Sequence, residues 1–153
     1  MRFAGTYREE GWRRCAAMSA ADDIRFTPWP HGDLPGWSLP ALEAAKCVAK
    51  QGDALFERVH LALYEAFFTR SLDIADPVVL TRLATQAGAD AARFTADFEG
   101  GLARQAVLAD YEAAVNEHGV RAIPTVIVAD TGRALVGLAD LATYRRAIEE
   151  AAA

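Results

Sequence analysis

The spacing of apolar side chains changes along the chain, and each change predicts a new structural element. Over residues 7–20, apolar residues recur at helical spacing, which predicts a first helix. Residues 24–29 then alternate between apolar and polar at a period of two, which predicts a short strand. Its far end leaves the ladder at Pro28, because proline has no backbone N–H to donate. The stretch 30–37, rich in proline and glycine, is predicted to be a loop.

Helical spacing dominates the middle of the chain. Ser38 is the predicted N-cap of a helix that ends near Gly52, with Pro40 in its first turn. A second helix begins at Asp53 and carries apolar residues at i, i+3 and i+4 as far as Phe68. Because its apolar stripe is the widest, we expect this second helix to be the most buried.

Aspartates and glycines mark the ends of three further helices. Asp76 is a predicted N-cap, and Gly88 is predicted to close the same helix in the left-handed conformation. Asp90 caps a short helix, and a third helix covers residues 102–118, where Gly119 stops it. The residues predicted to face inward on this third helix are Leu108, Tyr111, Ala114 and Val115.

After residue 119 the pattern changes to that of strands. A β-branched run at 124–128 predicts one strand, residues 130–132 predict a turn, and 133–136 predict a second strand, so the two form a hairpin. A final helix follows Gly137 and runs through Ile148. The predicted order is therefore helix, strand, a run of helices, then strand, strand and helix.

Composition and charge narrow the class of protein. A chain of 153 residues is predicted to form a single domain over 1–153 with one core. The 52% of hydrophobic residues includes many alanines, which favour helix. The net charge of -5 is spread without a basic stripe, so we expect no nucleic-acid partner. No apolar run is long enough to span a membrane, and the N-terminus has no apolar secretion signal, so we expect a cytoplasmic protein.

Cysteine and histidine are too scattered to form a recognisable metal site. Cys15 and Cys47 are separated by 31 residues, so we expect two reduced and mostly buried thiols. The three histidines are far apart, and no metal is predicted. His60, in the second long helix, is expected to be partly buried and to bond locally, or to line a pocket. In the loop 30–37 and just before it, Trp29, His31 and Trp37 either border a groove or pack over the edge of the core.

The segment around Ile123-Pro124-Thr125 resembles a known family. The run Gly119-Val120-Arg121-Ala122-Ile123-Pro124-Thr125, followed by strand residues and Gly137, is similar to the Gly-Val-x-x-x-Pro-Thr segment of the DsbA-like family, including its FrnE-type cytoplasmic branch. Further matching positions are spread upstream from Ser38 to Phe94. The resemblance implies an α/β, thioredoxin-like fold with an all-helical insertion over about residues 38–118.

The same resemblance assigns a substrate-binding role to Ile123, Pro124 and Thr125. In the family the corresponding proline is cis, and the backbone before it pairs with an extended peptide, so the expected partner is a thiol- or disulfide-containing peptide or a small thiol. Without the resemblance, a trans proline at the start of a strand would be expected, because only about 5% of X-Pro bonds in folded proteins are cis. The resemblance implies the keywords oxidoreductase and disulfide, and no tightly bound cofactor.

The catalytic half of the family's site is missing from the printed sequence. Relatives carry Cys-Pro-x-Cys at the start of the first helix, which corresponds to residues 3–7, where this chain reads Phe-Ala-Gly-Thr-Tyr. The catalytic residues are therefore unknown, and whether the chain is an enzyme stays open. Thr6 stands where some glutathione-dependent relatives hold a thiolate with serine, so glutathione is an alternative co-substrate. Arg121 either meets such an acidic substrate or is solvated.

The family's central first strand also has no counterpart here. We expect one of three situations: a true N-terminus upstream, a strand supplied by another chain, as in a homodimer, or direct closure of the remaining parts. Three functions follow as alternatives. They are a DsbA-like thiol-disulfide oxidoreductase whose Cys-x-x-Cys lies outside this N-terminally truncated sequence, a redox-inactive thioredoxin-fold binding or assembly module, and a glutathione-dependent transferase or isomerase.

Overall fold

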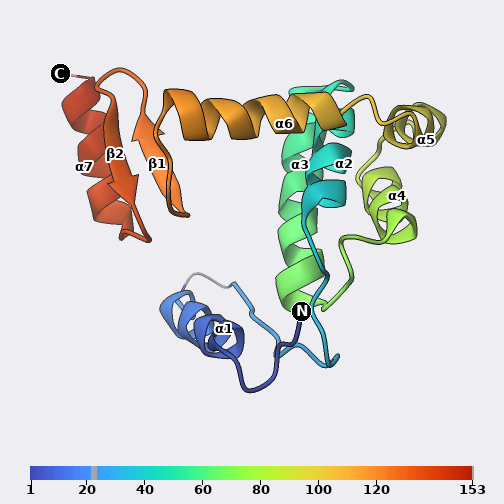
Figure 1. Ribbon diagram of the computed structural model, residues 1–153, viewed down its shortest axis with the longest axis horizontal. Coiled ribbons are helices and arrows are strands. Elements are labelled where there is room, and N and C mark those ends of the chain that lie inside the picture. Colours follow the sequence, from blue (N-terminus) through green and yellow to red (C-terminus); the bar gives the residue numbers. More distant parts are fainter. Residues whose placement is uncertain (22–23, 153) are drawn as a thin grey trace. The chain divides into compact units, whose positions relative to one another are not determined.

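The computed structural model describes residues 1–21 and 24–152 of the chain (Figure 1). The chain divides into two compact units, Met1–Leu108 and Ala109–Ala153, and each is considered by itself. The prediction of a single domain stays a prediction. In chain order the helices and strands are α1 (Tyr7–Met18), α2 (Leu39–Ala49), α3 (Asp53–Tyr64), α4 (Pro77–Gln86), α5 (Ala91–Glu99), α6 (Arg104–Glu112), β1 (Thr125–Val128), β2 (Arg133–Val136) and α7 (Leu141–Ala151).

The main core of the first unit is built around α2. This helix packs against α3, α4 and α5, and the four lie together in Figure 1. Its small side chains allow this close approach, and six of its residues are buried, whereas α3 buries three. The prediction that the helix from Asp53 is the most buried was therefore wrong. The width of an apolar stripe shows how much of a helix can be buried, but the number of neighbouring helices decides how much is. α2 is surrounded by three helices, α3, α4 and α5.

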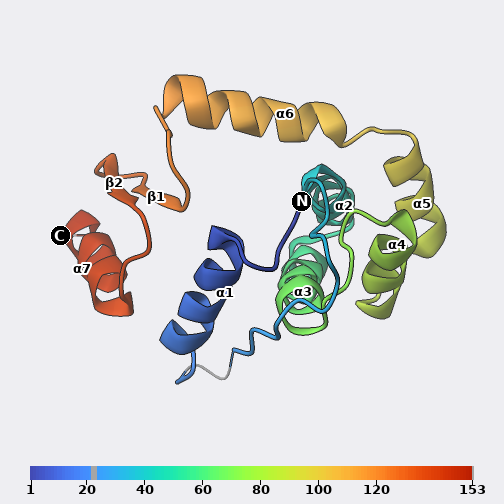
Figure 2. The same cartoon turned by 60° about the horizontal axis from the view of Figure 1, so that its bottom comes forward.

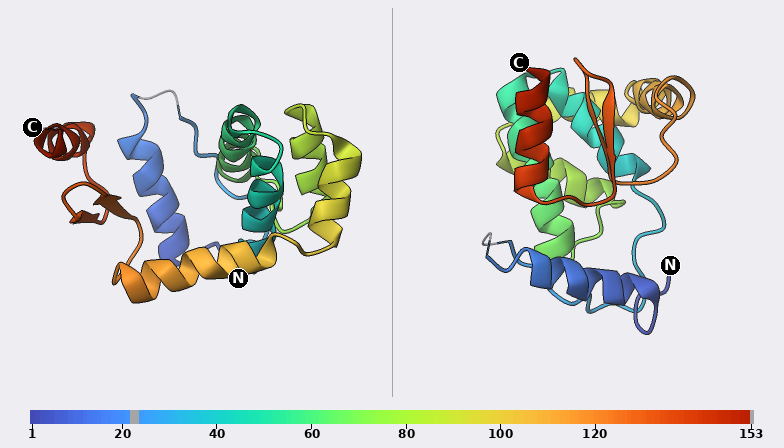
Figure 3. Two further views of the ribbon diagram at one scale, coloured as in Figure 1. Left: turned by 90° about the horizontal axis from the view of Figure 1, so that it is seen from above. Right: turned by 90° about the vertical axis from the view of Figure 1, so that its left-hand side faces the viewer.

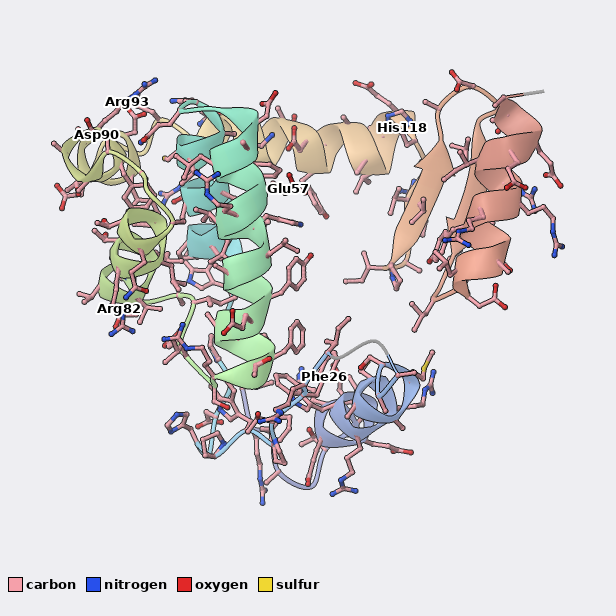
Figure 4. All side chains as sticks on the ribbon, turned by 180° about the vertical axis from the view of Figure 1, so that it is seen from behind. Phe26, Glu57, Arg82, Asp90, Arg93 and His118 are labelled. Atoms are coloured by element: carbon pink, nitrogen blue, oxygen red, sulfur yellow. The ribbon has the colours of Figure 1, made fainter. Side chains whose placement is uncertain are left out.

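Hydrogen bonds between distant segments join the end of α2 to the start of α5. The backbone N–H of Asp90 donates to Oε1 of Gln51 at 2.9 Å, and the Arg93 guanidinium donates to the carbonyl of Lys50 at 2.8 Å. Figure 4 shows Asp90 and Arg93 together at this end of α5. These bonds fix the corner where four helices meet.

The predicted aspartate caps are confirmed. Oδ1 of Asp76 accepts from the N–H of Val78 at 2.8 Å, and Oδ1 of Asp90 accepts from the N–H of Arg93 at 2.9 Å. Ser38 is the N-cap residue of α2, as predicted, and its side chain makes no capping hydrogen bond. Pro40 in the first turn lacks an N–H, which leaves α2 with one fewer group to cap.

The strand predicted over residues 24–29 is not formed. Residues 24–29 belong to no ladder, and Figure 2 shows this segment running past the end of α3. Its N–H at Thr27 donates instead to the carbonyl of Phe68 at 2.9 Å, and its carbonyl at Thr27 accepts from Nε1 of Trp12, also at 2.9 Å. In the described residues no strand lies beside it, so helix ends and side chains take the place of a ladder.

The second unit contains the predicted hairpin. β1 and β2 pair antiparallel, with Thr125 opposite Val136. The helix α7 packs against β1 and lies beside the hairpin in Figure 3. Asp140 caps α7, and hydrogen bonds from Thr143 hold the pKa of its carboxyl below its usual range. Among the described residues of this unit, Ala147 alone is buried. The unit therefore has almost no core of its own.

The helix predicted over 102–118 is present in two parts. α6 ends at Glu112, and a π-helical turn, η2 (Ala113–Glu117), continues it. The predicted inward face was wrong for Leu108 and Tyr111, which are exposed, whereas Ala114 and Val115 are half-buried. The buried residue of α6 is Val107, which the prediction did not name.

η2 and the corresponding π-helical turn η1 (Glu65–Thr69) close in the same way. After each turn, one N–H reaches back to a carbonyl six residues earlier, from Leu72 at 2.8 Å and from Val120 at 2.9 Å. Immediately before each of these donors, one residue adopts a left-handed conformation, with φ of 51° at Ser71 and 64° at Gly119. Glycine adopts this conformation freely, and serine does so at a cost. The Ser71 hydroxyl is also buried and has no partner among the described residues.

Replacing Ser71 by glycine is expected to raise the free energy of unfolding by about 1 kcal/mol. The change removes both a left-handed side chain and a buried hydroxyl without a partner, which together outweigh the entropy cost of glycine. Gly119→Ala is the matched reverse change, and it is expected to lower the free energy by about the same amount. Urea unfolding of both variants measures this. A destabilised Ser71→Gly variant would contradict the argument.

Candidate functional site

The loop that leads into β1 is held at its base by backbone and guanidinium hydrogen bonds. Nη1 of Arg121 donates to the carbonyl of Val115 at 2.8 Å and to that of Val120 at 3.1 Å. The side chain of Arg121 is exposed, yet its guanidinium is engaged with the loop rather than only with solvent. Arg121 therefore ties the start of the loop to the end of η2.

The end of the loop is fixed from the other side. Oγ1 of Thr125 donates to the carbonyl of Ala122 at 2.7 Å, and the N–H of Gly137 donates to the carbonyl of Pro124 at 2.8 Å. The Ile123–Pro124 peptide bond between these anchors is cis. Ile123 is 91% exposed, the highest value among the large hydrophobic residues described. The structure thus presents an apolar side chain on a loop anchored at both ends.

The start of α1 is the other region that the sequence singled out. Oγ1 of Thr6 accepts from the N–H of Arg8 at 3.3 Å and donates to the carbonyl of Phe3 at 2.7 Å. The next turn is braced by Glu9, whose pKa is lowered by a hydrogen bond from the N–H of Gly5 and by Arg13. The single hydroxyl proton of Thr6 is therefore used within the cap, and the thiolate-holding role stays a prediction.

An aromatic cluster in the first unit positions α1. Trp12 lies at its centre and contacts five other rings at centroid distances of 4.9 to 6.3 Å, which belong to Phe3, Phe26, Trp29, Phe67 and Phe68. Figure 4 shows Phe26 beside α1. Trp29 is buried in this cluster, as expected for a residue that packs over the core, while Trp37 is 59% exposed. The cluster holds α1 against η1, the π-helical turn that continues α3.

The two cysteines have opposite environments. Cys47 is fully buried in α2, and burial raises the pKa of its thiol, so the reactive thiolate is disfavoured. Cys15 is exposed on α1, which corrects the expectation that both thiols are buried. In α1 Trp12 alone is buried, so even a residue one turn further along the helix, such as Cys15, is exposed. The prediction of mostly buried thiols thus holds for Cys47 alone.

The histidines lie on separate elements, as their spacing predicted. His60 is exposed rather than partly buried, and its ring lies between those of Phe56 at 5.3 Å and Tyr64 at 5.0 Å along α3. His31 lies against Trp29 at 5.3 Å, and His118 ends η2. In residues 1–21 and 24–152, no cluster of three histidine, cysteine or acidic side chains could hold a metal ion. Nor does this part of the chain contain a helix long and apolar enough to cross a bilayer.

The sequence interpretation missed one ion pair, in which a buried carboxylate meets a half-exposed arginine. Glu43 in α2 is 4% exposed, and its Oε1 accepts from Nε of Arg104 at 2.5 Å. This contact raises the pKa of the Arg104 guanidinium further above its ordinary value. Glu43 follows the buried Ala41 and precedes Ala44 on the same helix, which was the one available signal. Its partner lies 61 residues away, so spacing could not identify it.

Comparison with known proteins gives one result, which covers most of the chain. Residues 17–149 match the family described as the DSBA-like thioredoxin domain. The matched region includes both the helices α2 to α6 and the Ile123–Thr125 loop. A search of curated proteins found no match.

Proposed function

The chain belongs to the DsbA-like thioredoxin family, which is a family of the thiol-disulfide oxidoreductase type. On this basis we propose that its loop Ile123-Pro124-Thr125 binds an extended peptide. The mixed α/β, mostly helical structure, with its helices inserted before the hairpin, is that of a thioredoxin-like fold with a helical insertion. The expected peptide contains a thiol or a disulfide. The FrnE-type branch and the cytoplasmic location stay predictions.

The observation that carries the proposal is the exposure of Ile123 on a loop that is already ordered. Its side chain is 91% exposed, and the loop on either side is fixed by Arg121 and Thr125. A binding surface that is ordered beforehand does not lose conformational freedom when it is occupied. An extended peptide can pair with backbone N–H and C=O groups of the loop by strand addition, and apolar side chains of the peptide can then cover Ile123.

The cysteines set the chemistry that these residues can perform. The printed 153 residues contain no Cys-x-x-Cys, and the two thiols present lie on different helices, one exposed and one buried. Exchange of a disulfide needs an accessible thiolate and a second thiol to resolve the mixed disulfide. We therefore propose that these 153 residues bind peptides without turning them over, and that exchange requires a cysteine pair outside them.

The glutathione-dependent alternative has no observation in its favour. Thr6 would have to donate its hydroxyl proton to a thiolate, but it donates that proton to Phe3 and accepts from Arg8 as the cap of α1. Arg121 is engaged with backbone carbonyls of its own loop. This alternative rests on the resemblance alone.

Ile123→Asp is expected to weaken binding of an extended, labelled peptide with a blocked thiol at least about tenfold, which is about 1.4 kcal/mol. The change places a charge where an apolar side chain would be covered, and the Ile123 side chain takes no part in the hydrogen bonds of Arg121 and Thr125. Fluorescence anisotropy measures the affinity. Leu138→Asp is the matched control, since Leu138 is also exposed, at 61%, and lies outside the loop.

Two results would count against the proposal. Equal loss of binding in Ile123→Asp and Leu138→Asp would show that the loop has no special role. In an insulin-reduction assay with dithiothreitol, the chain is expected to match its Cys15→Ala variant and a reaction without protein. Faster reduction that depends on Cys15 would show turnover by these residues and overturn the binding-only part of the proposal.

A further inference from the structure

A cavity of about 340 Å³ lies within the first unit, and the peptide-binding loop takes no part in it. Its walls come from the N-terminal halves of α2 and α4, the C-terminal half of α5 and the first residue of α6. All of its lining residues fall within 40–104, so they belong to Met1–Leu108. Pockets that bind small molecules have volumes of about 300 to 1,000 Å³. The cavity is therefore large enough for a small organic molecule.

The lining of the cavity carries more acid than base. Glu43 and Glu99 supply two carboxylates, and Arg104 is the single basic residue in the described lining, which leaves one negative charge in excess. The carboxylate of Glu43 is only partly used, because Nε of Arg104 lies 2.5 Å from Oε1 whereas Nη2 lies 3.4 Å from Oε2. A carboxylate has about four acceptor positions. Oε2 of Glu43 therefore keeps room for a further donor.

The helix ends at the cavity do not reverse the sign of this charge. Three helices begin there and one ends there, and each N-terminus carries about half a positive charge, each C-terminus about half a negative one. Their sum is about one positive charge. It is offset by the carboxylate of Asp76, which caps α4 and accepts from the N–H of Val78 at 2.8 Å. The excess negative charge of the lining therefore remains.

The rest of the lining combines hydroxyl groups with an aromatic wall. Thr81 and Thr95 both line the cavity, and within residues 1–21 and 24–152 neither hydroxyl takes part in a hydrogen bond. The ring of Phe98 stacks on that of the fully buried Phe94 at a centroid distance of 5.5 Å, which fixes this part of the wall. A hydroxyl oxygen can accept from an ammonium group, and an aromatic ring can cover an apolar body or attract a cation.

We propose that this cavity binds a small organic cation, a primary amine carried on a compact apolar body. The three N–H donors of an ammonium group are matched by the acceptors of Glu43, Glu99 and the two threonines, while Phe98 covers the apolar body. Arg104 stays on Oε1 of Glu43, so the amine adds to this ion pair and does not replace it. An anion is repelled by the excess charge, and a neutral molecule gains no ion pair. The site is separate from the proposed peptide-binding loop.

Three ligands with the same ring and different charges test the proposal on the unaltered chain. Benzylamine is cationic at pH 7, benzyl alcohol is neutral and benzoate is anionic. In an NMR titration of the ¹⁵N-labelled protein, benzylamine is expected to bind with a Kd of about 1 mM, with amide shifts concentrated at residues 75–81 and 95–104. Benzyl alcohol and benzoate are expected to bind at least about tenfold more weakly.

Glu99→Gln identifies the contribution of the cavity's charge. Glu99 is exposed and makes no contact that holds the core, so the fold is expected to be retained, which circular dichroism checks. The variant is expected to bind benzylamine at least about fivefold more weakly and benzyl alcohol as before. Glu57→Gln is the matched control, because Glu57 is exposed on α3 and does not line the cavity (Figure 4). It is expected to bind benzylamine as the unaltered chain does.

Three results would each overturn the proposal. The first is equal affinity for the three ligands, which would show that the cavity does not select charge. The second is a set of amide shifts outside residues 75–81 and 95–104. The third is an equal effect of Glu99→Gln and Glu57→Gln on the affinity for benzylamine, which would indicate a general response to net charge. The comparison of ligands needs no variant, so it decides the question whatever the stability of Glu99→Gln.

Discussion

Replacing Trp12 by alanine is expected to lower the free energy of unfolding by about 3 to 5 kcal/mol. Trp12 is 8% exposed, contacts five aromatic rings, and donates from Nε1 to the carbonyl of Thr27 at 2.9 Å. The substitution removes the apolar area of the largest side chain, leaves a cavity among the remaining rings and strands a carbonyl. Since a domain of this size is stable by only about 5 to 15 kcal/mol, a large part of that stability is lost.

The effect of Trp12→Ala should be concentrated at α1. Of the residues in α1, Trp12 alone is buried, so the aromatic cluster is the main attachment of this helix to its unit. Hydrogen exchange is expected to show loss of protection in α1 before α2 and α3 are affected, because local elements open separately when their contacts are few. Chemical unfolding gives the total change.

Trp37→Ala is the matched control for Trp12→Ala. The two changes remove the same side chain, but Trp37 is 59% exposed, and substitutions at such surface positions usually change stability by less than about 0.5 kcal/mol. Trp12→Phe is expected to destabilise the protein by an intermediate amount, because phenylalanine keeps an aromatic ring in the cluster but cannot donate the hydrogen bond to Thr27. Equal destabilisation by Trp12→Ala and Trp37→Ala would contradict the assignment of the cluster as the anchor of α1.

Local signals in the sequence predicted most of the elements. Asp76 and Asp90 cap their helices because a cap depends on residues two or three positions away. The hairpin of β1 and β2 was predicted for the same reason, since its turn and its β-branched residues are adjacent in the chain. Interactions within one turn or one hairpin are visible as spacing.

Features that depend on distant neighbours were not predictable in this way. The alternating residues 24–29 have strand spacing, but a strand forms only beside another strand, and helix-end groups satisfy this segment instead. Leu108 and Tyr111 have the spacing of a buried face, yet which face of α6 is covered depends on its neighbours. Pattern gives the period of an element, and packing decides which positions the core covers.

The same distinction between local signals and distant contacts applies to the candidate site. Ile123, Pro124 and Thr125 were identified from a short motif, and the structure adds how the loop is anchored and how far Ile123 is exposed. Thr6 was identified by its position relative to the family pattern, and its hydroxyl is occupied by the cap of α1, a role that the sequence also allows. Nothing in the spacing distinguished these two uses of a threonine.

The pair Glu43–Arg104 leads to the second large effect. Glu43 is buried among the alanines of α2, and Arg104 supplies two guanidinium nitrogens, with Nε at 2.5 Å from Oε1 and Nη2 at 3.4 Å from Oε2. Arg104 is about half exposed, so most of its charge is already screened by water. The importance of the pair lies in Glu43, since a buried carboxylate without a partner is strongly destabilising.

Arg104→Met is expected to lower the Tm by about 10 °C or more, because it strands the Glu43 carboxylate in the core. Methionine retains the apolar stem of arginine, so the loss of packing is small. Arg82→Met is the matched control: Arg82 is exposed on α4 and points away from it in Figure 4, and the same substitution there should change the Tm little. Differential scanning calorimetry measures all of these variants.

The double variant Glu43→Leu with Arg104→Met separates the pair's contribution from that of packing. Removing both charges leaves no stranded group, and apolar replacements of buried ion pairs are often neutral or stabilising, so most of the loss in Tm should be recovered. The coupling between the two sites is then large and of opposite sign to the single effects. If the double variant were as unstable as the sum of the two single variants, the stranded carboxylate could not be the cause, and Arg104 would stabilise the first unit through its packing instead.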